Sequence, residues 1–160
     1  MNAMLTLTLV AALSLNAAHA KKPKACAKDL KCFIEASRTC APAKVEHALD
    51  IDLAGMKNTI DRTYEITADS GAKCTLEVKT LSMKFDASPE AIRNIKKASP
   101  GTSDADIRKE IDKQNAQQAK ALPKPMTCHF APGFLANIMA KLRDGSFDSA
   151  DWDVGCPKSE

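Results

Sequence analysis

Residues 45–66, VEHALDIDLAGMKNTIDRTYEI, decide the fold of this chain. Apolar and polar residues alternate on both sides of Ala54-Gly55, which predicts two antiparallel strands joined by a two-residue turn. Because the side-chain period of a strand is two, this turn fixes the register along the whole hairpin. Three predicted pairs join apolar residues: Leu53–Met56, Leu49–Ile60 and Val45–Tyr64. The hairpin therefore has one apolar face that another element must cover.

A third strand is predicted to follow the loop Asp69-Ser70-Gly71 and to run as far as Phe85. The glycine suits the left-handed conformation that is usual in such a three-residue loop. The apolar phase changes beyond Val78, which predicts a bulge near Thr80. The expected partners across this second hairpin are Ile66 with Cys74, Tyr64 with Leu76, and Asp61 with Lys79.

Helix signals flank the predicted strands on both sides. Lys28–Thr39 has an apolar stripe and stops before Pro42, so it is expected to form a helix that covers the sheet. Later elements are expected from Ser88 to Ala98, from Ser103 to Ala121, at 126–130 (a short strand) and from Phe134 to Leu142. The predicted class is therefore α+β: an antiparallel three-strand meander plus a short fourth strand, covered by an N-terminal helix, with additional helices after residue 86.

The N-terminal segment differs from the rest of the chain. All 23 Lys and Arg and all 20 Asp and Glu follow residue 20. Leu5–Ala18 is mostly apolar and leads into Ala18-His19-Ala20, the small-residue pattern of a secretory cleavage site. The apolar stretch is too short to span a bilayer core of ~30 Å. We therefore expect a signal peptide at residues 1–20, cleaved after Ala20, and a single exported domain at 21–160, periplasmic or secreted and without a transmembrane anchor.

Six cysteines follow the expected cleavage site, and in an oxidising compartment they predict three disulfides. They are Cys26, Cys32, Cys40, Cys74, Cys128 and Cys156. If Lys28–Cys40 is helical, Cys32 and Cys40 lie ~12 Å apart along the axis, beyond the ~7 Å limit for bonded Cα atoms. Cys26 can reach Cys32 only from a turn before the helix. The simplest arrangement joins the three N-terminal cysteines to the three later ones, with Cys156 fastening the tail.

His47 and Arg62 share the inward phase and face each other in the predicted register. Two basic groups among apolar neighbours suggest a weak anion or carboxylate site. The simpler interpretation is packing at the end of the sheet, with Arg62 reaching solvent over its own stem.

Other reactive residues do not form a recognisable motif. The acidic run Asp144, Asp148, Asp151 and Asp153 lacks the ligand spacing of an EF-hand, and helix capping by Asp148 or Ser149 explains most of it. In the exported chain only His47 and His129 could act as a catalytic base. There is no nucleophile elbow, and the cysteines are assigned to disulfides. We predict no catalytic residue, no cofactor and no metal.

Five short motifs resemble a pattern in small uncharacterised exported bacterial proteins. They are CFIEASRTCAPAKV at 32–45, DLAGMK at 52–57, GAKC at 71–74, CHF at 128–130 and the ending GSFDSADWDVGC at 145–156. The resemblance covers most of the chain after residue 20. It implies an exported, disulfide-bonded domain of unknown activity, and it provides no catalytic residues.

The leading hypothesis is an exported, non-enzymatic, disulfide-stapled binding or envelope-associated module, whose partner would be an envelope or secreted protein. A net charge of +3 with interleaved charges, and no nucleic-acid-binding motif, do not favour nucleic acid as the partner. One alternative is a periplasmic inhibitor of a hydrolase. Another is a small hydrolase-type enzyme, which would need His47 or His129 in a pocket with a carboxylate.

Overall fold

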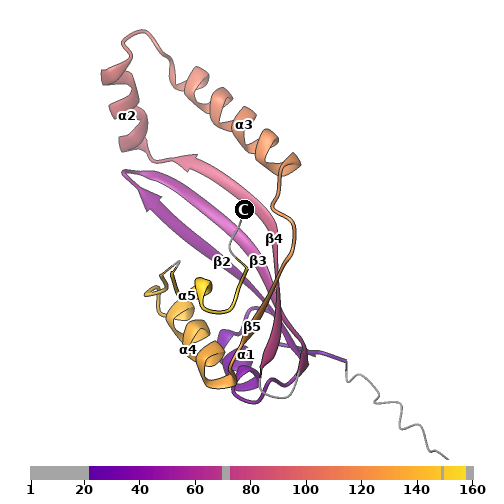
Figure 1. Ribbon diagram of the computed structural model, residues 1–160. Coiled ribbons are helices and arrows are strands. Elements are labelled where there is room, and N and C mark those ends of the chain that lie inside the picture. Colours follow the sequence, from indigo (N-terminus) through magenta and orange to yellow (C-terminus); the bar gives the residue numbers. More distant parts are fainter. Residues whose placement is uncertain (1–21, 70–72, 149, 158–160) are drawn as a thin grey trace, which may run out of the picture.

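The computed structural model describes residues 22–69, 73–148 and 150–157, arranged around one sheet with strand order β1-β2-β3-β4-β5 (Figure 1). The strands are β1 Lys24–Ala25, β2 Ala43–Leu53, β3 Met56–Asp69, β4 Cys74–Ala87 and β5 Met126–Phe130. The helices are α1 Leu30–Ser37, α2 Pro89–Ala98, α3 Asp104–Lys120, α4 Pro132–Arg143 and α5 Ala150–Asp153. The α+β class is confirmed. The sheet also contains a parallel pair, β1–β2, which the alternation does not predict.

The β2–β3 hairpin has the predicted register. Leu53 pairs with Met56, and the same register continues along the strands to Ala43 and Ile66. Ala54 and Gly55 have φ values of 54° and 83°, the left-handed conformations that a two-residue hairpin turn requires. Space also requires the glycine, because a Cβ at Gly55 would lie 2.5 Å from the Oγ of Ser88.

The predicted register between β3 and β4 is wrong, by two residues at Ile66 and by three at Asp61, beyond the register shift. Ile66 pairs with Leu76 instead of Cys74, and Asp61 pairs with Ser82 instead of Lys79. The strand β3 continues to Asp69, with an irregularity between Ile66 and Ala68, so the connection starts later than expected. The predicted loop residues Ser70 and Gly71 lie outside the described residues. The bulge expected near Thr80 is confirmed, because the register shifts where Thr80 pairs with Arg62.

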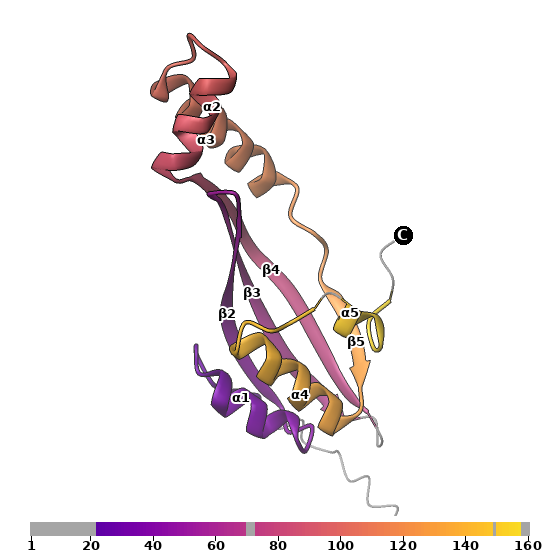
Figure 2. The ribbon, with the colours of Figure 1, turned by 90° about the vertical axis from the view of Figure 1, so that its left-hand side faces the viewer.

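The long strands β2, β3 and β4 connect two parts of the molecule (Figure 2). We call the described residues of 22–46, 63–79 and 121–157 the base, and residues 47–62 and 80–120 the arm. In the base, α1 and α4 lie side by side on the face of the sheet that carries Val45, Tyr64 and Ile66, and we call this the inner face. The opposite face is the outer face. The arm ends in the pair α2 and α3, far from α1 and α4.

The two parts have cores of very different size. The base core contains twenty buried residues, among them Phe33 of α1, Tyr64 of β3 and Leu135 of α4, each with at most 1% of its surface exposed. The arm cluster contains four: Ala87, Ala91, Ile92 and Ile107. Burial of apolar area is the main favourable term in folding, so the base holds most of the stability.

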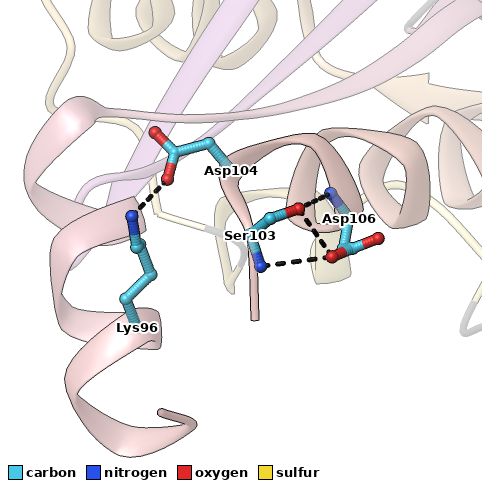
Figure 3. A network of polar contacts seen from close by, with 4 residues as sticks. All are labelled: Lys96, Ser103, Asp104 and Asp106. Atoms are coloured by element: carbon cyan, nitrogen blue, oxygen red, sulfur yellow. Dashed lines mark hydrogen bonds and ion pairs between the residues drawn. The ribbon is translucent and has the colours of Figure 1, made fainter. Parts of the chain in front are cut away.

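Polar contacts supplement the small core of the arm. The Oγ of Ser88 accepts a hydrogen bond from Ala91 N at the start of α2, as its capping sequence predicts. Ser103 and Asp106 form a reciprocal capping box at the start of α3 (Figure 3). Lys96 of α2 lies 2.7 Å from Asp104 of α3, so an ion pair joins the two helices.

The structure contains three disulfides, and the predicted pairing of the first three cysteines with the last three is wrong for two of them. The bonds are Cys26–Cys32, Cys40–Cys74 and Cys128–Cys156. Cys26 lies in a turn before α1, where Ala27 has a φ of 50°, so its Cα comes within 5.7 Å of that of Cys32. The C-terminal segment runs beside β5, where His129 N donates to Gly155 O at 2.8 Å and thereby places Cys156 next to Cys128.

The expected signal peptide, residues 1–20, lies outside the described residues. No helix in the described part of the chain is long and apolar enough to cross a membrane. The three disulfides are compatible with an oxidising compartment.

Candidate functional site

His47 and Arg62 are partners across β2 and β3, as the register predicts. Both lie on the inner face where the base meets the arm, and both are partly buried. Burial lowers the pKa of His47, so its imidazole is neutral at pH 7. Burial raises the pKa of Tyr64, the next residue on this face, and nearby Arg62 opposes that shift. The pair therefore carries a single positive charge, that of Arg62, which is weak support for an anion site.

The groove nearest to this pair has acidic as well as basic residues in its lining. A depression of about 340 Å³ is lined by Lys28, Glu46, His47, Ala48, Asp61, Arg62, Leu81 and Ser82. Strand alternation puts Ala48 and Asp61 on the outer face, and His47 and Arg62 on the inner face. The Nε of Arg62 is buried and lacks a hydrogen-bond partner among the described residues. The unpartnered Nε–H of Arg62 favours an anion, but the carboxylates of Glu46 and Asp61 in the lining and the neutral imidazole of His47 favour packing of the arginine stem at the junction instead.

His129 does not join His47 in one site. It lies on β5 with its side chain exposed, and its Nδ1 is 3.4 Å from the Oγ1 of Thr75. Two strands, β3 and β4, separate β5 from β2 in the sheet. Three steps of about 4.8 Å between strands already separate the two histidines by roughly 14 Å across the sheet. The register separates them further along the strands, because His129 pairs with Thr75, which lies beyond the level of Ala43.

The acidic run near the C-terminus forms structural contacts. Asp148 Oδ1 accepts a hydrogen bond from Ala150 N at 3.0 Å and so caps α5, as predicted. Asp151 pairs with Lys141 at 2.7 Å, and Asp144 pairs with Arg143 at 2.7 Å. Within 22–69, 73–148 and 150–157, no three His, Cys, Asp or Glu residues come together as metal ligands.

One edge of the sheet is open in the arm. In the base this edge is filled by residues 24–27: Cys26 N donates to Lys44 O at 2.8 Å, and Glu46 N donates to Ala27 O at 2.7 Å. Backbone groups alternate between the two sides of a strand, so Ala48, Asp50 and Asp52 direct their N–H and C=O groups to the same edge. None of these groups has a backbone partner among the described residues.

At the opposite edge of the arm, α3 covers the backbone of β4 at Phe85. Phe85 of β4 donates its N–H to Asn115 Oδ1 at 2.8 Å, and Asn115 Nδ2 donates to Phe85 O at 3.0 Å. The carboxamide of Asn115 thus takes the place that a neighbouring strand would have. Edge strands invite pairing with other chains, and proteins commonly cover them. The structure covers β4 with α3 and leaves β2 open.

The open part of β2 has an apolar row on one side and an acidic row on the other. On the inner face, Leu49 and Ile51 are partly buried, and Leu53 is 70% exposed. On the outer face lie Asp50 and Asp52. Hydrogen bonds from Thr59 and Lys57 lower the pKa of Asp50, so this carboxylate is charged at neutral pH. We call residues 47–53 the β2 edge, and it is the candidate binding surface.

Sequence reasoning identified the apolar row and missed the open edge. Alternation shows which face of a strand is buried, but not how far a neighbouring strand extends. The partner strand β1 has only two residues, too few to show any period. The role of Asn115 was also missed, because one polar residue in a polar helix carries no signal of a backbone contact.

Comparison with known proteins gives no relative: no protein-family model, no curated protein and no solved structure matches this chain.

Proposed function

We propose that this protein is an exported, non-enzymatic binding module, released as residues 21–160 into the periplasm or the medium, with an envelope or secreted protein as its partner. The observation that carries the proposal is the β2 edge, where unpaired backbone groups lie beside an apolar row in an arm that projects from the base. The base supports this role, because all three disulfides and an antiparallel sheet packed against α1 and α4 provide a rigid support.

The arrangement of reactive groups supports a non-enzymatic role. His47 and His129 lie on strands that β3 and β4 separate. Each of the six cysteines is in a disulfide. A hydrolase needs a base within hydrogen-bond reach of its nucleophile or water, oriented by a third group. In the described part of the chain neither histidine is hydrogen-bonded to a carboxylate, which argues against such a reaction.

A second candidate is inhibition of a hydrolase. The tip of the β2–β3 hairpin lies at the far end of the arm, and it exposes Leu53. An exposed apolar side chain on a tight turn suits insertion into a cleft. The hairpin tip is similar to an inhibitory loop in shape alone, so inhibition of a hydrolase ranks second to the binding role.

Site-specific cross-linking tests the proposal. A photoreactive residue replaces Leu53 in the exported protein, and the matched control carries it at Glu77, an exposed strand position in the base. After illumination in envelope extract, we expect an adduct from position 53 that excess unlabelled protein removes, and none from position 77. A third variant carries the photoreactive residue at Gln117 on α3. If neither position 53 nor position 117 gives an adduct that excess unlabelled protein removes, the binding role is wrong.

A further inference from the structure

We infer that the β2 edge binds an extended segment of a partner protein as an added strand, and that this segment alternates apolar residues with lysine or arginine. The inference rests on the proposed binding function and specifies its partner. In strand addition, main-chain hydrogen bonds supply affinity and alternate side chains supply specificity.

The backbone of β2 shows that this edge accepts a strand. The segment 24–27 of the chain already occupies the first part of the edge through three hydrogen bonds of 2.7–2.9 Å, at Pro42, Lys44 and Glu46. The segment then turns away at Ala27, which has a φ of 50°. The next positions along the same line, Ala48, Asp50 and Asp52, are open. An incoming strand would therefore continue the line of β1 into the arm.

The side chains of β2 specify the incoming strand. An added strand presents its side chains alternately to the two faces of the sheet. On the inner face they would meet Leu49, Ile51 and Leu53, which favours apolar residues. On the outer face they would meet Asp50 and Asp52, near Glu46. From Glu46 to Leu53 the strand has three carboxylates and no Lys or Arg. Lys57 of β3 pairs with Asp50 at 3.0 Å and offsets one of these charges, so the row stays net negative and favours a basic row on the partner.

The same charges argue against a second copy of this chain as the occupant. Antiparallel pairing of two β2 edges about Asp50 would place that carboxylate directly opposite its copy. Like charges in opposing positions destabilise a strand pair. The acidic row is thus a barrier to self-pairing and an attraction for a basic strand.

A short fluorescent peptide in which valine and lysine alternate is the probe, and a peptide of alternating valine and glutamate is its control. We expect fluorescence anisotropy to show binding of the first and not of the second. In NMR hydrogen exchange on the full exported protein, the first peptide should protect the amides of Ala48, Asp50 and Asp52. Protection at α2 or α3 instead, or equal binding of both peptides, would overturn the inference.

Two substitutions of Asp50 separate the contribution of its backbone N–H to binding from that of its carboxylate. Asp50→Pro removes an N–H that faces the open edge, and proline is tolerated at such edge positions. Asp50→Ala keeps the N–H and loses the carboxylate. We expect Asp50→Pro to weaken binding of the lysine peptide about tenfold relative to Asp50→Ala, with the hydrogen-exchange protection of the α2 and α3 amides in the arm unchanged. Equal affinities of the two variants would overturn strand addition.

The outcomes distinguish this inference from the proposed function. If the wild-type protein dimerises and Asp50→Pro abolishes the dimer, the occupant is a second copy and the inferred partner is wrong. In envelope extract, the probe at Gln117 on α3 could give an adduct that unlabelled protein removes while the probe at Leu53 gives none. If the lysine peptide also protects no amide of β2, the protein binds a partner but not through the β2 edge.

Discussion

Ala54 holds the β2–β3 turn at a conformational cost. Its φ of 54° lies in the left-handed region, which an ordinary L-residue adopts at a cost of about 1–2 kcal/mol. Asparagine tolerates this conformation better and is favoured in such turns. We expect Ala54→Asn to raise the free energy of unfolding by about 0.5–1 kcal/mol, measured by urea denaturation. Ala54→Ser, which lacks that preference, is the control, and equal stability of the two variants would contradict the explanation.

The lowered pKa of His47 makes stability depend on pH. Because burial disfavours the imidazolium, the unfolded chain takes up a proton at a higher pH than the folded chain does. The contribution of His47 is complete above the unfolded pKa of about 6.5 and is lost as the pH falls through the lower folded value. We expect the urea midpoint to fall between pH 7 and pH 5, and His47→Gln to flatten this fall. If the urea midpoint of the variant falls as steeply between pH 7 and pH 5 as that of the wild type, groups other than His47 cause the fall.

Among the elements, α3 depends on one side chain for its polar contact with the sheet. Asn115 makes two hydrogen bonds to the backbone of Phe85. Each bond of this kind contributes about 0.5–1.5 kcal/mol, and its loss leaves the Phe85 groups without a protein partner. We expect Asn115→Ala to speed hydrogen exchange at Phe85 and to lower stability by about 1–3 kcal/mol. Gln117→Ala, an exposed position on the same helix, should change neither quantity, and equal effects of both variants would refute the edge contact.

The β2–β3 hairpin shows what the sequence can predict at the level of elements. Its two-residue turn and strict alternation leave a single register, which also places His47 opposite Arg62. The β3–β4 register was not determined in this way, because a slip of two residues returns every side chain to the same face. Tyr64 thus meets Val78 instead of Leu76, and the apolar pairing is kept.

Contacts between distant elements were harder to predict. The Cys26–Cys32 bond depends on a turn with a left-handed Ala27, and alanine gives no signal of that conformation. Cys156 reaches Cys128 because the chain returns along β5, where a Cβ at Gly155 would lie 2.4 Å from the ring of Phe130. For the candidate surface, the apolar residues were predictable, and the absence of a covering strand was not.

At the scale of the whole molecule, the disulfides stabilise the base unequally. Cys40–Cys74 closes a sequence separation of 34 residues, and Cys26–Cys32 closes one of 6. In the loop-entropy model the longer loop contributes about 1.5 kcal/mol more. We expect Cys40→Ala with Cys74→Ala to lower the melting temperature more than Cys26→Ala with Cys32→Ala. Peptide mapping of the unreduced protein should yield the three observed pairs, and a reversed order of melting temperatures would contradict the entropic account.

We expect the arm to lose its structure while the base keeps its own, and not the reverse. The arm cluster has four buried residues, so truncating one of them removes a large share of its packing. Ile107→Ala removes buried methyl groups at a cost of about 2–5 kcal/mol, which the small cluster can absorb only by opening. We expect amides of α2 and α3 to lose protection from hydrogen exchange, while those of α1 and α4 keep it. Ile138→Ala in the base core is the matched control and should weaken protection throughout, because the arm has no support of its own. Uniform loss of protection in the Ile107→Ala variant would show that base and arm form one cooperative unit, and that the β2 edge is held as firmly as the core.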